Sequence, residues 1–158
     1  MTPTIQTISS KKLIGKHIAM SFVANKTFEL WSSFMPQRKL IANAVDSQHM
    51  YSLQLYGKDF YTNFNPAREF EKWAALEVAN FDAVPEGMET LIIPGGQYAV
   101  FHYKGAHTNG FDVFSYIFGE WLPASGYELD DRPHFEILGP KYKNGDPDSE
   151  EEIWIPIK

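Results

Sequence analysis

Two residues near the C-terminus combine a carboxylate with a large aromatic ring. Glu152 and Trp154 stand two positions apart in the run 152–158, which is otherwise rich in isoleucine. Successive side chains of a strand point to opposite faces, so Ile153 and Ile155 would face the core while Glu152 and Trp154 share the other face. A carboxylate beside an indole can hold a planar cation through charge and ring contact. The alternative is an edge strand whose second face is simply solvated.

The composition limits the classes of function. A length of 158 residues is typical of one domain, or of two similar halves that share a core. The net charge of −6 argues against direct nucleic-acid binding, which needs clustered Lys and Arg. The absence of cysteine excludes disulfides and thiolate chemistry. The sequence has no signal peptide pattern and no stretch that could cross a bilayer, so we expect a cytoplasmic protein without membrane contact.

Other chemistries have weak support in the sequence. The five histidines include no pair four residues apart, so we expect no metal site and no cofactor. The sequence contains neither a Gly-x-Ser-x-Gly nucleophile motif nor a phosphate-binding loop. The aromatic fraction of 15% is high, which indicates that some rings line a cavity rather than fill a core.

The first half alternates strand and helix patterns. We expect strands near Ile5–Ile8, Lys16–Val23, Met50–Tyr56 and Glu69–Val78, with a helix over Phe28–Phe34. The polar run Ser9–Lys12 is predicted to be a turn between the first two strands. Thr27 is the expected helix N-cap, and Pro36 ends or kinks that helix.

The second half repeats this order after Val84–Gly87, the best internal boundary. We expect strands over Glu89–Ile93, Gln97–Tyr103, His134–Leu138 and the C-terminal run, with an amphipathic helix from Phe111 to Trp121. The helix is expected to end at Leu122–Gly126. Pro94-Gly95-Gly96 is predicted to form a hairpin turn.

Residue matches support a duplication. Glu71-Lys72-Trp73 recurs as Glu152-Ile153-Trp154, an offset of 152 − 71 = 81, and Gly15 and Gly96 share that offset. We therefore expect a single domain over 1–158, with one repeat over 1–84 and a second over 88–158. A pseudo-two-fold axis would place a groove where the repeats meet. Because two nearby buried carboxylates repel, Glu71 should be more solvated than Glu152 or otherwise paired.

Several runs of the sequence resemble a known family. They are Ile93–Phe101 with Gly105, Glu120–Glu128, Arg132–Glu136, Glu152–Ile157 and, less specifically, Phe70–Val78. Together they resemble the gyrase-inhibitor-like (GyrI-like) effector-binding domains. These are the effector modules of AraC-type and MerR-type multidrug regulators, and they also occur as free-standing proteins.

The resemblance implies both a fold and a ligand. The fold would be α+β, with two βαββ repeats, helices on one side of the sheet and a ligand groove on the other. The groove would bind a lipophilic, cationic or aromatic molecule. Glu152 matches the family's charge-neutralising glutamate, and Trp154 and Trp73 would supply aromatic walls. Further ligand-binding candidates are Tyr51, Tyr98 and Tyr103.

The regulators carry a helix-turn-helix domain, and no such segment precedes the first expected strand. We therefore expect a protein that either sequesters a xenobiotic, or senses one and passes the signal to a separate regulator. Two alternatives stay open. One is a hydrolase of a reactive aromatic genotoxin, with Glu152 as acid or base. The other is an interaction subunit whose groove holds a partner peptide.

Overall fold

The computed structural model describes residues 1–46, 48–105, 113–143, 146 and 148–158. The expected start of the second helix at Phe111 lies outside the described residues, as does part of the loop that precedes the last strand.

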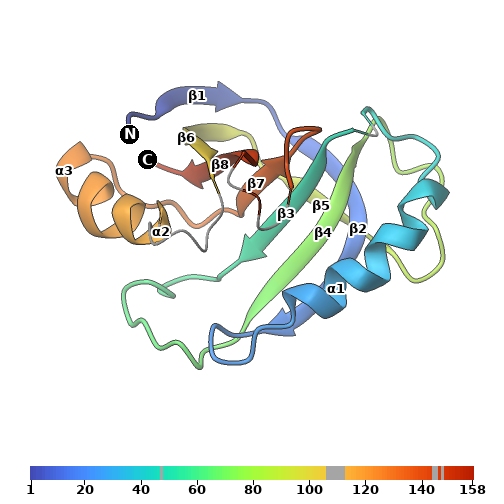
Figure 1. Cartoon of the computed structure of the whole chain (residues 1–158), viewed down its shortest axis with the longest axis horizontal. Helices are drawn as coiled ribbons and strands as arrows, with labels where there is room; N and C mark the ends of the chain where they lie inside the picture. Colours follow the sequence, from blue (N-terminus) through green and yellow to red (C-terminus); the bar gives the residue numbers. More distant parts are fainter. Residues whose placement is uncertain (47, 106–112, 144–145, 147) are drawn as a thin grey trace.

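A curled antiparallel sheet forms the body of the protein (Figure 1). The strands are β1 (Thr4–Ile8), β2 (Lys11–Met20), β3 (Met50–Leu55), β4 (Phe70–Val78), β5 (Glu89–Ile93), β6 (Gly96–Lys104), β7 (His134–Leu138) and β8 (Glu150–Pro156). The helical segments are α1 (Thr27–Phe34), η1 (Met35–Leu40), α2 (Val113–Tyr116), η2 (Ile117–Trp121) and α3 (Leu122–Ser125). The predicted α+β class is confirmed at this level.

The strand order explains why two predicted turns are wrong. The order is β1-β6-β8-β7-β3-β4-β2-β5, so β5 pairs with β2 at one end of the sheet while β6 pairs with β1 and β8 near the other. Pro94–Gly96 is therefore a crossing connection and not a hairpin turn. Likewise Lys11 and Lys12 belong to β2 rather than to a turn. A Cβ on Gly95 would lie 2.8 Å from the carbonyl oxygen of Ile8, because the two connections pass each other closely.

The helices cover one face of the sheet. Leu30 and Phe34 of α1 pack on β2 and β4, and Ile117 of η2 packs on β6 and β8. Ile153 and Ile155 are buried on this face, as the alternation of the C-terminal run predicted. Burial of these apolar side chains is the main force that holds the helices on the sheet.

The opposite face, here called the inner face, carries an aromatic core of its own. Its central ring is Phe135 of β7, which stacks on Trp154 and contacts Tyr51 and Tyr98. The ring centroids lie 5.3 to 5.7 Å apart. Tyr98, a member of this cluster, is fully buried. The inner face is thus a packed floor, and not an open aromatic groove along its whole length.

Two helix details differ from the sequence prediction. Thr27 is the first residue of α1, whereas Lys26 is its N-cap, and Phe28 points to solvent with 84% of its surface exposed. The second helical segment continues past Pro123 to Ser125. Pro123 directly follows η2, a π-helical turn over Ile117–Trp121, and this local change in the hydrogen-bond pattern accommodates the missing N–H of proline. Gly126 ends the segment at a φ of 81°.

Candidate functional site

Two hollows in the described part of the chain lie on opposite faces of the sheet. The first, here called the acidic hollow, opens on the inner face and has a volume of about 670 Å³. It is lined by Val45, Asp46, His49, Tyr51, Glu77, His102, Tyr103, Lys104, Ile137, Gly139, Pro140, Lys141, Glu150, Glu151 and Glu152. The second, here called the aromatic hollow, lies on the helix-covered face and has a volume of about 560 Å³. Both are large enough for a drug-sized ligand.

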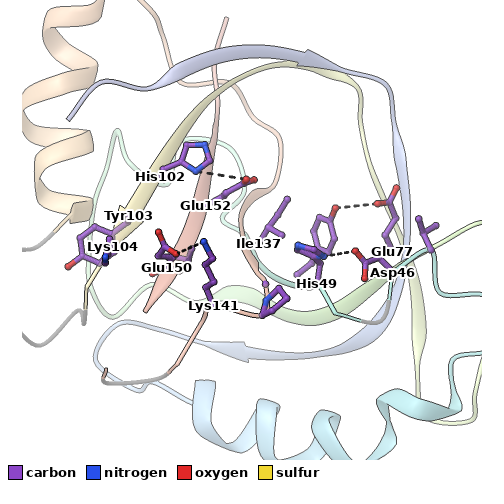
Figure 2. Close-up of a pocket in the computed structure, with 15 residues that line it drawn as sticks. Asp46, His49, Glu77, His102, Tyr103, Lys104, Ile137, Lys141, Glu150 and Glu152 are labelled. Atoms are coloured by element: carbon purple, nitrogen blue, oxygen red, sulfur yellow. Dashed lines mark hydrogen bonds and ion pairs between the residues drawn. The ribbon is translucent and has the colours of Figure 1, made fainter. Parts of the chain in front are cut away.

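Carboxylates stand on both walls of the acidic hollow (Figure 2). On one wall Glu77 of β4 accepts a hydrogen bond from the Tyr51 hydroxyl at 3.3 Å. On the other wall Glu152 of β8 lies 4.0 Å from the imidazole of His102. Ile137 stands between the two walls (Figure 2). Burial, reinforced by the Glu77 carboxylate, raises the pKa of Tyr51, so its hydroxyl stays a hydrogen-bond donor.

The acidic hollow carries an excess of negative charge. Its lining includes five carboxylates, from Asp46, Glu77, Glu150, Glu151 and Glu152, against the two lysines Lys104 and Lys141. Lys141 is 3.4 Å from Glu150, an exposed ion pair of small energetic value. The excess favours a cation over an anion at this face.

The floor of the aromatic hollow is polar. Gln54, Lys72 and Glu136 rise from the neighbouring strands β3, β4 and β7, and each is less than a tenth exposed. The Gln54 side-chain amide donates a hydrogen bond to Glu136 Oε1 at 3.3 Å. Burial lowers the pKa of Lys72, and the Glu136 and Glu151 carboxylates oppose that shift.

Aromatic rings form the walls above that floor. They belong to Phe22, Tyr56, Tyr61, Phe64, Phe70, Phe114 and Phe118. Tyr61 stacks on Phe118 with centroids 4.7 Å apart, which joins the loop after β3 to the helical segment. Burial raises the pKa of Tyr61 to about 12. Burial also lowers the pKa of the adjacent His134 to about 3, so this imidazole is neutral at physiological pH.

Comparison with known proteins decides the family. The whole chain, residues 1–158, matches the family described as the GyrI-like small molecule binding domain. The chain belongs to this family. It is also 30% identical over 130 residues to the transcriptional regulator BrlR of Pseudomonas aeruginosa. That match covers 82% of this chain and 45% of BrlR, so the matched region spans less than half of that relative.

Solved structures share the fold. SAV2435 bound to tetraphenylphosphonium is 17% identical, with a TM-score of 0.73 and coverage of 100% of this chain and 94% of the other. EcmrR in its complex with DNA is 16% identical, with a TM-score of 0.69 and coverage of 99% and 57%. At this identity the two likenesses establish the fold of the GyrI-like domain and nothing further.

The residues predicted to bind ligand divide into two sets in the GyrI-like domain. Glu152, Tyr51 and Tyr103 line the acidic hollow. Trp73, Trp154 and Tyr98 lie in the inner-face core, where they are 3%, 6% and 0% exposed and outside the lining of either hollow. A direct contact between these three rings and a ligand stays a prediction.

The expected pairing of Glu71 agrees with the structure. Its side chain is 43% exposed, lies 3.7 Å from His17 and accepts a hydrogen bond from the Trp73 indole. The β4 carboxylate that lines the acidic hollow is Glu77, six residues later on the same face.

Sequence reasoning missed the polar floor of the aromatic hollow. The signal was present, because Lys72 shares its strand phase with the apolar Phe70 and Leu76, and Glu136 shares its phase with Leu138. A charged residue on the buried phase of a strand is costly unless it is paired or used.

The described residues were also searched for a metal site and for a membrane-spanning helix. Those residues contain no group of three His, Asp or Glu side chains placed to hold a metal ion. None of the helices they form is both long and apolar enough to cross a membrane.

Proposed function

We propose that this GyrI-like domain binds a lipophilic aromatic compound in the aromatic hollow, and that it thereby senses or sequesters a xenobiotic in the cytoplasm. The observation that carries the proposal is a set of aromatic walls above a buried polar floor, with Tyr61 and Phe118 at its rim. Ring contacts of this kind contribute about 0.5–1.5 kcal/mol each, and the polar floor fixes the orientation of the ligand. The tetraphenylphosphonium complex of SAV2435 supports the proposal, because that relative of the same fold holds a lipophilic aromatic molecule.

The acidic hollow is the second candidate position, and its charge favours it for cations. Glu152 would neutralise the ligand there, beside Tyr51 and Tyr103. Stacking on Trp154 or Trp73 would require movement of the inner-face side chains that now cover them. The acidic hollow contains Glu152, the charge-neutralising residue expected from the sequence, and we propose it as the alternative binding site.

The neutral fluorescent probe N-phenyl-1-naphthylamine tests the aromatic hollow. Phe118→Ala removes one wall, so we expect at least about a tenfold rise in the dissociation constant, equivalent to about 1.4 kcal/mol. Phe28→Ala is the matched control, because Phe28 is exposed and does not line the hollow. Equal affinity in wild type and Phe118→Ala, or no binding at all, would overturn the aromatic hollow as the site.

Tetraphenylphosphonium tests the acidic hollow. If the cation binds there, Glu152→Gln should remove most of the melting shift that a saturating concentration produces in the wild type. A shift that Glu152→Gln leaves intact and Phe118→Ala removes would place the cation in the aromatic hollow instead.

The two halves of the chain are, we further infer, repeats within one domain over 1–158. The strand order maps onto itself in reverse when β1–β4 are exchanged with β5–β8. The Glu71–Trp73 and Glu152–Trp154 pairs also make the same hydrogen bond at the offset of 81 residues. These two facts support a duplicated unit with a pseudo-two-fold axis between β3 and β7. The unit has the order ββαββ, one strand more than the βαββ expected from the resemblance.

A regulatory role is the proposed use of the binding. BrlR is a transcriptional regulator, and the GyrI-like domain matches less than half of it. We propose that ligand binding here is passed to a DNA-binding partner. If the domain co-elutes with another protein and an added dye displaces that protein, the interaction-subunit alternative is favoured instead. If the domain converts a reactive aromatic compound and Glu152→Gln abolishes this turnover, the hydrolase alternative is favoured.

A further inference from the structure

We propose that the aromatic hollow selects aromatic ligands that carry an anionic group, and that Lys72 is the residue that binds this group. The inference rests on the proposed function, because it concerns the same hollow. It assigns a ligand class opposite in charge to the one that the acidic hollow favours.

Lys72 is buried at the floor of the hollow. It lies in the middle of β4, where it is opposite Gln54 of β3 and Ile18 of β2, and 7% of its surface is exposed. Its side chain nevertheless lines the hollow. Within the described part of the chain, the Lys72 ammonium makes no hydrogen bond and no ion pair.

The nearest carboxylates act on Lys72 without contacting it. Glu136 accepts the Gln54 amide at 3.3 Å, and both Glu136 and Glu151 affect Lys72 only through their longer-range charge. An ammonium has three hydrogen-bond donors, and an unpaired one in an apolar site is costly. An acceptor supplied by a ligand would remove that cost, and the low local dielectric would strengthen the attraction.

The walls determine what else the ligand must carry. Phe70, Tyr56 and Phe118 line the same hollow as Lys72, so a ligand anchored on the ammonium would have aromatic rings around it. A sulfonate, carboxylate or phenolate attached to a fused or linked ring system has this combination.

Two fluorescent probes with the same ring skeleton test the inference. 8-Anilino-1-naphthalenesulfonate carries a sulfonate, and N-phenyl-1-naphthylamine lacks it. We expect the wild type to bind the sulfonate probe at least about tenfold more tightly than the neutral probe, a difference of about 1.4 kcal/mol. Lys72→Met should raise the dissociation constant of the sulfonate probe about tenfold and change that of the neutral probe less than about threefold.

Lys16→Met is the matched control. Lys16 lies on the neighbouring strand β2, also at the helix-covered face, but it donates a hydrogen bond to Ser33 and does not line the hollow. The substitution removes the same charge, so it should leave the affinity for both probes unchanged. A loss of sulfonate binding equal to that in Lys72→Met would mean that net charge, and not Lys72, determines the preference.

The outcomes separate the inference from the proposed function. If the wild type binds the two probes with equal affinity, Lys72 does not have the proposed role, but the aromatic hollow is still a binding site. This comparison requires no variant. An unchanged probe ratio in folded Lys72→Met or Lys72→Gln would overturn that role as well. Failure of both probes to bind the wild type, or indifference of both to Phe118→Ala, would overturn the proposed function itself.

Discussion

The indole N–H of Trp154 donates a hydrogen bond to Glu152 Oε1 at 3.0 Å. Trp73 makes the same bond to Glu71 at 2.6 Å, on β4. Residues two apart on a strand share a face, so each indole can hold the carboxylate beside it at the surface of the inner-face core. The ring that the sequence predicts as a ligand wall thus orients the predicted charge-neutralising residue.

This relationship predicts a measurable coupling. A double-mutant cycle of Trp154→Phe and Glu152→Ala should show a coupling of about 0.5–1.5 kcal/mol in the free energy of unfolding, because each change removes one partner of the same bond. Urea denaturation measures all four proteins. The parallel cycle of Trp73→Phe and Glu71→Ala should give a coupling of similar size. Additive effects in both cycles would show that the indole–carboxylate bonds contribute no stability.

Alternation predicted the strands well but not their partners. The C-terminal run was correctly read because Ile153 and Ile155 fall on one phase, and β5 and β7 have the predicted bounds. Pairing of β1 with β6 joins segments about 90 residues apart in the sequence, and no local pattern encodes such a contact. For this reason the prediction of a hairpin between β5 and β6, across Pro94-Gly95-Gly96, is wrong.

The candidate site was predicted in part. Glu152 and Tyr51 do line a hollow, since the inner-face phase of their strands could be read from the sequence. The strand phase places Lys72 and Glu136 on the helix-covered face, but the gap above their strands depends on the three-dimensional position of α2, which the sequence does not give. A strand pattern gives the face of a side chain, but whether that face is covered depends on helices placed by the whole fold.

The orientation of α1 on the sheet predicts a contrast between two phenylalanines. Phe34 is fully buried and contacts Trp31 edge to face, whereas Phe28 is 84% exposed. Phe34→Ala should lower the free energy of unfolding by about 3–5 kcal/mol, while Phe28→Ala should change it by less than about 0.5 kcal/mol. Chemical denaturation tests both. A comparable loss in the two variants would contradict this orientation of α1.

Close packing of β2 on β4 predicts that Gly15 cannot be replaced. A Cβ at Gly15 would lie 2.0 Å from the Ala74 carbonyl oxygen and 2.6 Å from the Ala75 Cα. Because these are backbone atoms of a central strand, Gly15→Ala should cost about 3 kcal/mol or more. Gly119→Ala is the control, since nothing lies within 4 Å of its Cβ position and alanine favours a helix. A melting temperature of Gly15→Ala equal to that of the wild type would contradict this packing.

Burial of His134 predicts a loss of stability in mild acid. Its imidazole is 5% exposed, edge to face with Tyr56 at 4.8 Å, and burial lowers its pKa from 6.5 to about 3. Below pH 6.5 the unfolded chain binds a proton that the folded protein does not, so stability falls as the pH drops, until the folded protein is also protonated near pH 3. Between pH 7 and pH 5 the loss should be about 2 kcal/mol.

The matched variant for this titration is His134→Gln, which should be less stable at pH 7 but should lack that part of the pH dependence. Urea denaturation at several pH values from 7 to 5 gives the difference in slope between the two proteins. An NMR titration provides a direct measurement, because one of the five histidines should stay neutral at pH 5. If all five imidazoles titrate between pH 6 and 7, His134 is not buried as described, and the wall that it forms with Tyr56 and Tyr61 beside the aromatic hollow is open to water.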